Sequence, residues 1–238
     1  MNISLTNLSK VTFRANVTPS RSTQATSIKT NLQPQQDTFE KSDKKASNAS
    51  KYSTTDIFYI NDNHGRLGNM SRIYSAKELY DFNTKNSTAD KLVLAAGDIS
   101  AGADAHIVKA ANTYMNALGV EATSDGNHEY DANPSEIAES KKGAKFKSLG
   151  MNLQIPKGNP LDGVIEKSFV LEKNGHKYAI IGLAPPDLHE RIRDNDSRKQ
   201  IGVDDFEKTI KDVQAAVDEY KKQGINKVIL LSHCGLTK

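Results

Sequence analysis

Four short apolar runs, separated by helical patterns, are the strongest constraint that this sequence places on its fold. The runs are DIFYI (56–60), KLVLAA (91–96), VEATS (120–124) and KVILL (227–231). Short runs rich in β-branched residues are typical of strands buried on both faces. Segments 69–83, 104–118 and 204–223 carry apolar residues at helical spacing, and a shorter helix is expected near residue 134. This alternation predicts an α/β fold with parallel strand pairing.

A second, partly antiparallel sheet is expected from residues 167–184. Two strand-like runs in this segment flank Asn174 and Gly175, and Asn-Gly between such runs is the strongest short-range hairpin signal. Segment 145–153 is predicted to be a further strand beside this hairpin. Two sheets packed together, with helices outside them, are consistent with this set of elements.

The first 52 residues differ in composition from the rest of the chain. They are mostly Ser, Thr, Asn, Gln and Lys, with isolated apolar residues and no sustained period. Such a segment buries too little apolar surface to offset its ordering entropy, so residues 1–52 are predicted to be a disordered polar tail before a folded domain at 53–238. The first 50 residues carry seven Lys/Arg and three Asp/Glu, a net charge of +4, while the whole chain carries +3. The domain is therefore close to neutral and shows no nucleic-acid footprint.

Several other classes of protein are disfavoured by the sequence. No stretch approaches the apolar length of a membrane span. The N-terminus alternates polar and apolar residues without a continuous apolar core, so a standard secretory signal is not expected, and the compartment stays open. The single Cys234 excludes an intramolecular disulfide. Neither a P-loop nor a Gly-x-Gly-x-x-Gly motif occurs, which removes the commonest nucleoside-triphosphate and dinucleotide interpretations.

Ligand-type side chains follow each of the four predicted parallel strands. Asp62 and His64 follow the first strand, Asp98 the second and His233 the last, while SDGNHEYD (124–131) overlaps the end of the third. In open α/β sheets ligands bind outside the carboxyl ends of the strands, so these side chains are expected to converge. A mixture of Asp, His and Asn suits hard and borderline divalent metals. The sequence therefore predicts a metal site at this edge.

Each of these residues also has a structural explanation when it is taken alone. Asp98 after Gly97 fits a turn, Asn127 suggests a turn, and a lone histidine near a strand end is more often a hydrogen-bonded structural residue than a ligand. The coincidence at four strand ends is what favours a metal site. Three further histidines lie outside this pattern and are expected to be solvated: His106, His176 and His189.

The same residues resemble a known family. The ordered blocks NDNHGRL (61–67), LAAGDISAG (94–102), MNALGVEATSDGNHEYD (115–131) and ILLSHCGL (229–236) resemble the calcineurin-like metallophosphoesterases. Within that family they look like the 5′-nucleotidase branch, and the match runs in order from about residue 55 to the last residue. The resemblance implies a four-layer αββα sandwich, incomplete at the C-terminus, and a hydrolase that uses two divalent ions, of Mn, Zn, Fe, Co or Mg, to activate a shared water.

The resemblance also implies a set of metal ligands. Asp62 and His64 would bind the first ion, and Asn127 and His233 the second. Asp98 would bridge both ions, because a carboxylate offers two oxygens.

Catalytic roles in the SDGNHEYD loop follow from the same resemblance. His128 would face the phosphate, stabilise charge in the transition state and protonate the leaving group. Asp131 would hold the His128 ring by a hydrogen bond. Gly126 is expected to let the backbone turn at the strand end, and no role is predicted for Glu129.

The chain departs from the family pattern at its C-terminal side. Family members carry a Gly-His-x-His block downstream of the His233 position, which supplies one ligand to each metal. The 5′-nucleotidases also have a C-terminal domain with phosphate-binding arginines and aromatic residues that stack on the base. The domain at 53–238 is therefore expected to lack its C-terminal part, with weak metal affinity and little turnover in this polypeptide.

The leading functional hypothesis is a phosphomonoesterase that acts on nucleoside 5′-phosphates. A 2′,3′-cyclic-nucleotide phosphodiesterase or a nucleotide-sugar hydrolase on the same scaffold is the first alternative. A non-catalytic scaffold with an incomplete metal site is the second. The expected partner is a small phosphoester or nucleotide, and the sequence leaves the oligomeric state open.

Overall fold

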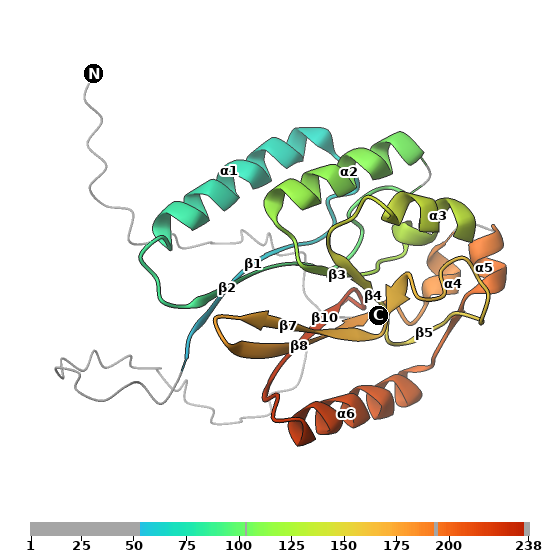
Figure 1. Cartoon of the computed structure of the whole chain (residues 1–238). Coiled ribbons are helices and arrows are strands. Elements are labelled where there is room, and N and C mark those ends of the chain that lie inside the picture. Colours follow the sequence, from blue (N-terminus) through green and yellow to red (C-terminus); the bar gives the residue numbers. More distant parts are fainter. Residues whose placement is uncertain (1–52, 103, 193–194, 236–238) are drawn as a thin grey trace, which may run out of the picture. The chain divides into compact units, whose positions relative to one another are not determined.

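The computed structural model describes residues 53–102, 104–192 and 195–235 (Figure 1). The predicted disordered tail at 1–52 lies outside the described residues. Among the helices that the structure describes, none combines the length and the apolar character needed to cross a membrane.

A five-stranded parallel sheet places the candidate ligands at one edge. Its strands lie in the order β1-β2-β3-β4-β6, and all neighbouring strands pair in parallel. Their bounds are β1 Thr55–Ile60, β2 Asp90–Ala95, β3 Ala122–Ser124, β4 Lys147–Leu149 and β6 Ile165–Glu166. Three of the predicted strands are thus confirmed within one to two residues, and their carboxyl ends share one edge of the sheet. The expectation that the fourth run, 227–231, pairs in parallel with them is wrong, because this strand lies in the second sheet.

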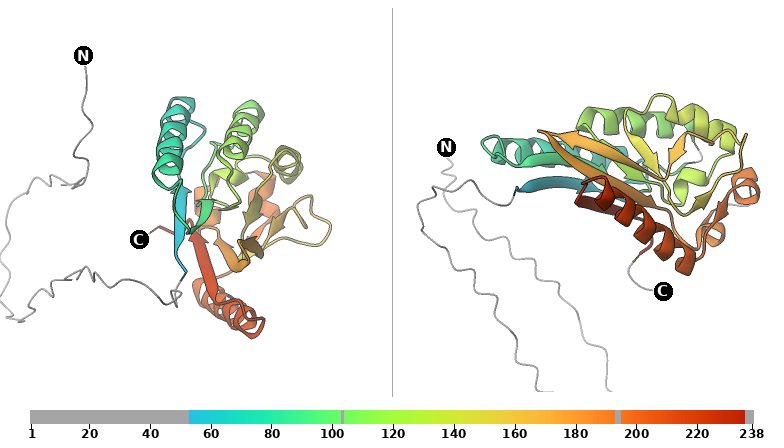
Figure 2. Two further views of the ribbon diagram at one scale, coloured as in Figure 1. Left: turned by 60° about the vertical axis from the view of Figure 1, so that its left-hand side comes forward. Right: turned by 60° about the horizontal axis from the view of Figure 1, so that its bottom comes forward.

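Helices α1 (Leu67–Asn83), α2 (Ala105–Leu118) and α3 (Pro134–Lys141) cover one face of this sheet (Figure 2). Met70 of α1 and Met115 of α2 pack in one cluster with Val93 of β2. Helix α2 begins after Asp104, whose carboxylate accepts two backbone N–H groups of the first turn, and it ends at Gly119 with φ of 76°. These are preferred capping residues, so the local sequence fixes where this helix starts and stops.

The second sheet packs against the other face of the first. It comprises β7 (Ser168–Lys173), β8 (His176–Leu183) and β10 (Lys227–Ser232), in the order β10-β8-β7. Strands β7 and β8 form the predicted antiparallel hairpin, in which both Asn174 (φ 48°) and Gly175 (φ 78°) have positive φ. Such angles at both central residues are those of a type I′ turn.

Helix α6 (Phe206–Lys222) covers the outer face of the second sheet and completes four layers. Between the sheets, Leu92 and Leu94 of β2 pack in one cluster with Ile180 of β8. On the outer side, Val213 and Val217 of α6 pack in the cluster that contains Ile181. The expected αββα sandwich is therefore confirmed for the described residues.

The prediction for segment 145–153 is wrong in its strand pairing. Strand β4 lies between β3 and β6 in the first sheet, and β5 (Leu153–Gln154) pairs antiparallel with β9 (Gly202–Val203). Leu149 of β4 does contact the hairpin, because a Cβ atom added at Gly182 of β8 would lie 2.3 Å from the Leu149 Cβ. Contact across the interface between the sheets, rather than strand pairing, brings this segment to the hairpin.

Asp90 links the two sheets at the end opposite to the candidate ligands. Its buried carboxylate accepts hydrogen bonds from Tyr178 Oη at 2.5 Å, Asn174 Nδ2 at 2.9 Å and His176 Nδ1 at 2.6 Å. The expectation that His176 is only solvated is therefore wrong. Burial raises the pKa of Asp90, but the hydrogen bonds from Tyr178, Asn174 and His176 outweigh this effect and lower the pKa to about 2.

His189 also differs from expectation. It lies in α4 (Leu188–Arg191), and its Nε2 donates a hydrogen bond to the carbonyl oxygen of Ile201 at 2.6 Å. Ile201 follows α5 (Asp196–Gln200), so this contact joins the two short helices between β8 and α6.

Candidate metal centre

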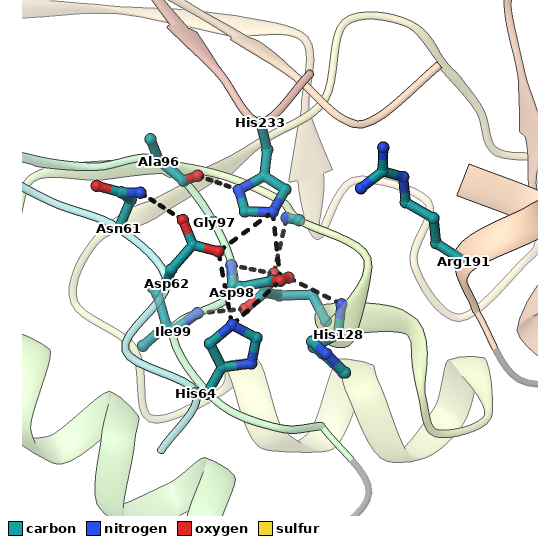
Figure 3. Close-up of polar contacts among 12 residues, drawn as sticks. Asn61, Asp62, His64, Ala96, Gly97, Asp98, Ile99, His128, Arg191 and His233 are labelled. Carbon is teal, nitrogen blue, oxygen red and sulfur yellow. Dashed lines mark hydrogen bonds and ion pairs between the residues drawn. The ribbon is translucent and has the colours of Figure 1, made fainter. Parts of the chain in front are cut away.

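Loops from four strand ends converge at the carboxyl edge of the two sheets (Figure 3). Their side chains form two overlapping groups of possible metal ligands, and within each group the ligand atoms lie within 4.8 Å of one another. One group is His64, Asp98 and His128, and the other is Asp62, Asp98 and His233. Asp98 is common to both groups, so the structure brings together five of the residues singled out in the sequence.

The spacing of the donor atoms fits a divalent cation. Oδ2 of Asp98 lies 3.3 Å from Nε2 of His233 and 3.7 Å from Nε2 of His64. Oδ1 of Asp62 lies 3.5 Å from the same His64 atom and 3.9 Å from the same His233 atom. Imidazole nitrogen and carboxylate oxygen bind zinc at about 2.0–2.2 Å, which separates two ligands of one ion by roughly 3–3.5 Å. Only small side-chain movements would therefore be needed to enclose an ion.

Asp98 offers one oxygen, rather than two, to this cluster. Its Oδ1 accepts the backbone N–H of His128 at 3.0 Å, which leaves Oδ2 facing His64 and His233. The sequence-based argument that both oxygens would be used is not supported by this arrangement, and a bridging role would fall to Oδ2. Burial raises the pKa of Asp98, but the hydrogen bonds from His233 and from the His128 N–H, together with the charges of these two histidines, outweigh it and the pKa is lowered.

Two histidines near Asp98, His233 and His128, are oriented by hydrogen bonds at their Nδ1 atoms. Nδ1 of His233 donates to the carbonyl oxygen of Ala96 at 2.5 Å, which directs Nε2 toward Asp98. The hydrogen bond with Asp98 raises the pKa of His233 to about 9 in the metal-free chain, against the opposing effect of burial. Nδ1 of His128 lies 2.5 Å from Oδ2 of Asp131, as the resemblance implies. A fixed Nδ1 partner selects the tautomer that presents Nε2 to a ligand.

Three of the candidate ligands have an unusual backbone conformation. The φ angles of Asp62, His64 and Asp98 are 53°, 51° and 49°, in the left-handed region that non-glycine residues rarely adopt. The first two loops are also joined, since Asp62 N–H donates to the Gly97 carbonyl and His64 N–H to that of Asp98. Each such residue costs on the order of 1–3 kcal/mol, and this strain is typical of functional sites.

Gly126 allows a close approach rather than a turn. Its φ lies outside the left-handed region, whereas Gly97 has φ of 87°. A Cβ atom at Gly126 would lie 2.2 Å from Oδ1 of Asp98, and one at Gly97 would lie 2.6 Å from the Gly126 nitrogen. The expected turn role of Gly126 is therefore corrected: the glycine lets the third loop pack directly on Asp98.

The remaining predicted residue, Asn127, lies in the same loop. It is buried, and its backbone carbonyl oxygen accepts a hydrogen bond from the N–H of Tyr130 in the 3-10 helix η1 (His128–Tyr130). Its role as a metal ligand stays a prediction.

Sequence reasoning missed two charged residues of the site. Glu129 accepts backbone hydrogen bonds from both the Asp98 loop and its own loop, and burial, with Asp125 and Asp98 nearby, raises its pKa to about 7. Arg191 of α4 lies at the edge of the site, where its exposed guanidinium binds Asp187 and interacts electrostatically with Asp98 (Figure 3). The Glu129 contacts depend on tertiary structure, and Arg191 lies in an ordinary charged segment, so neither gave a local signal.

Comparison with known proteins identifies the family. A model of the calcineurin-like phosphoesterases matches residues 55–238. The chain is 28% identical over 219 residues to the NAD 5′-nucleotidase of Haemophilus influenzae, covering 82% of this chain and 34% of that protein. It is 31% identical over 151 residues to the 2′,3′-cyclic-nucleotide 2′-phosphodiesterase/3′-nucleotidase of Yersinia enterocolitica, covering 60% of this chain and 22% of that protein.

A solved structure gives the same result for the fold. The 5′-nucleotidase precursor from Thermus thermophilus matches with a TM-score of 0.64 and 27% identity, over 75% of this chain and 37% of that one. The chain thus spans about a third of the length of the first of these relatives and of this structure. Because the family model covers most of the sequence and includes every candidate ligand, the chain belongs to the calcineurin-like phosphoesterase family.

Proposed function

We propose that this chain hydrolyses phosphomonoesters in a metal-dependent reaction, with nucleoside 5′-phosphates as its substrates. The position of Asp98 Oδ2, 3.3 Å from His233 Nε2 and 3.7 Å from His64 Nε2, carries the proposal. Oxygen and imidazole ligands from three separate loops meet there, in a family that is defined by phosphoester hydrolysis.

The proposed ligand sets share Asp98 Oδ2. Asp62 and His64 would complete one set, and Asn127 and His233 the other. Divalent ions such as Mn²⁺ or Zn²⁺, when bound, would lower the pKa of a water molecule and neutralise phosphoryl oxygens. The loops after β1 and β2 are held together without an ion, because the Asp62 and His64 N–H groups donate to the carbonyl oxygens of Gly97 and Asp98.

His128 would act on the substrate in this proposal. Asp131 binds its Nδ1, and in the imidazolium form of the ring Nε2–H would donate a hydrogen bond to a phosphoryl oxygen and then the proton to the leaving oxygen. The ring also contacts His64 edge-on, with centroids 4.9 Å apart. That contact places the proposed acid, His128, next to the proposed metal ligand His64. A phosphate bound to the ion would therefore lie within reach of His128.

Arg191 is the proposed phosphate-binding cation. Asp187 contacts its Nε and one Nη atom at 2.7 and 3.0 Å, which fixes the guanidinium plane and leaves further N–H donors for an anion. Planar guanidinium groups match the geometry of phosphate oxygens. Arg191 would therefore strengthen substrate binding more than it would accelerate the chemical step.

The substrate class is inferred from the relatives. The Haemophilus relative bears the name NAD 5′-nucleotidase, which supports a nucleotide substrate. The Yersinia relative is named as both a 2′,3′-cyclic-nucleotide 2′-phosphodiesterase and a 3′-nucleotidase, which supports cyclic-nucleotide hydrolysis as the second candidate. The same ligand set would serve either reaction.

The test is product analysis on AMP, 2′,3′-cyclic AMP and UDP-glucose, with Mn²⁺ and with EDTA. The proposal predicts release of phosphate from AMP that requires Mn²⁺ and is lost in His128→Ala but retained in His106→Ala, a change on the exposed side of α2. Faster hydrolysis of 2′,3′-cyclic AMP than of AMP would favour the second candidate. Binding of Mn²⁺ without hydrolysis of any nucleotide would favour a non-catalytic scaffold.

A further inference from the structure

Glu129 connects two of the loops that carry candidate metal ligands. Its Oε2 accepts the backbone N–H of Asp98 at 2.9 Å and that of Gly126 at 2.7 Å. Its Oε1 accepts the N–H of Ile99 at 2.9 Å. One carboxylate thus binds three amides, two from the loop after β2 and one from the loop after β3.

Asp98 forms the reciprocal contact. Its Oδ1 accepts the backbone N–H of His128, so each loop sends a carboxylate to the backbone of the other. There is no spare room between the loops, since a Cβ atom at Gly126 would overlap Asp98. The direction of Asp98 Oδ2 and the position of the Asn127–His128 peptide are therefore set together.

Hydrogen bonds of the buried Asp125 hold the loop that contains Glu129 in place. Asp125, whose side chain is fully buried, accepts hydrogen bonds from Tyr130 Oη at 2.8 Å and from Lys141 Nζ at 3.2 Å. Lys141 also binds Ser148 Oγ of β4 at 2.7 Å. Movement of the third loop would break these contacts, so Glu129 joins the Asp98 loop to a rigid partner.

We propose that Glu129 is a positioning residue for the metal centre, which holds the Asp98 loop and the Asn127–His128 loop in their ligand-binding arrangement. The inference rests on the proposed metal-dependent function, but it concerns affinity for the ion and not turnover. It predicts that loss of Glu129 weakens binding of both ions, because Asp98 belongs to both proposed ligand sets.

The Glu129→Gln substitution separates this role from volume and packing. The amide has the same size, and its single oxygen can still accept the Asp98 and Gly126 N–H groups. Its NH₂ group would then face the N–H of Ile99, donor against donor, which leaves this backbone amide without an acceptor. The backbone of the Asp98 loop should move away from this contact and carry the metal ligand with it.

Glu121→Gln provides a matched control. Glu121 also accepts a backbone N–H across strands, from Val93 at 3.2 Å, and also pairs with Lys173, but it lies before β3 and away from the strand ends that carry the ligands. Its substitution is expected to lower thermal stability without changing the affinity for metal. A general loss of stability can therefore be distinguished from a loss of positioning.

The experiment is calorimetric titration of the wild type and both variants with Mn²⁺, with folding checked by circular dichroism. Loss of a partner that orients metal ligands typically weakens affinity by about tenfold to a hundredfold, and this loss is expected in Glu129→Gln alone. Unchanged Mn²⁺ affinity in folded Glu129→Gln, or an equal loss in Glu121→Gln, would overturn the inference. A wild-type chain that binds no Mn²⁺ would overturn it together with the proposed function.

If Glu129→Gln does not fold, amide hydrogen exchange in the wild type decides. The amides of Asp98, Ile99 and Gly126 should exchange much more slowly than that of Gly158, which binds the exposed Asp162. Exchange as fast as at Gly158 would contradict the proposal. A wild type that binds Mn²⁺ tightly but hydrolyses no nucleotide would refute the proposed function while leaving the role of Glu129 intact.

Discussion

Nε2 of His233 lies 3.3 Å from Oδ2 of Asp98, and this contact joins the ends of β10 and β2, which belong to different sheets. The second sheet therefore contributes directly to a site that the first sheet otherwise builds. The contact also explains why Asp98 is central: its other oxygen binds the His128 N–H, so one carboxylate organises three loops.

Asp98→Asn is predicted to weaken metal binding severely. The amide keeps the shape of the side chain but removes the negative charge that both proposed ligand sets share. The Mn²⁺ affinity should fall by more than about 100-fold, beyond the effect expected for loss of an orienting partner. Titration calorimetry checks this, with Asp212→Asn on the exposed side of α6 as the control. Equal affinities in the wild type and Asp98→Asn would refute the shared-ligand assignment.

His128→Ala is predicted to impair catalysis without removing the metal. General acid–base groups contribute about 10²–10⁴-fold to rate, so kcat for AMP should fall within that range. Mn²⁺ affinity should stay close to that of the wild type. His128 also lies close enough to His64 and Asp98 to bind an ion with them. A large fall in Mn²⁺ affinity in this variant would therefore identify His128 as a metal ligand instead.

Arg191→Ala is predicted to raise KM for AMP by about tenfold, with a smaller change in kcat. A hydrogen bond to a charged group contributes about 1.5–3 kcal/mol, and exposure of Arg191 to solvent places the effect at or below the lower end of that range. Arg191→Lys should recover part of the loss, since it keeps the charge but not the planar fork. Arg198→Ala on α5 is the control, and an equal rise in KM there would count against a specific role.

Acid should destabilise the domain partly through Asp90. Its pKa of about 2 in the folded chain lies below the ordinary value of 3.8, so its stabilising contribution is complete above about pH 5 and is lost as the pH falls toward 2. The difference corresponds to about 2 kcal/mol. Urea unfolding of the wild type and Asp90→Asn at several pH values checks this. The gap in unfolding free energy should narrow in acid, and a gap that stays constant would contradict the assignment.

Features that depend on local sequence patterns, or on the direction of parallel strands, could be predicted from the sequence. Runs such as 56–60 and 227–231 are strands because they are apolar and β-branched, and Asn174-Gly175 turns because both residues tolerate positive φ. The convergence of Asp62, His64 and Asp98 followed from the rule that the carboxyl ends of parallel strands share an edge. That rule does not account for His233, because β10 lies in the second sheet.

Features that depend on packing between distant segments could not be predicted. Residues 147–149 pair with β3 of the first sheet, and no local sequence pattern shows which sheet such a short strand joins. His176 binds Asp90 across the two sheets, and Glu129 binds amides of a loop some thirty residues away. Each contact needs the complete sandwich before its partners meet.

Anomalous scattering from crystals soaked in Zn²⁺ tests the metal centre most directly. The account predicts an anomalous peak about 2.0–2.2 Å from Oδ2 of Asp98, with His233 Nε2 or His64 Nε2 at a similar distance. A second peak that shares the same oxygen would support the two-ion proposal. Zinc bound only elsewhere on the chain, with Asp98 and His233 still in direct contact, would contradict it.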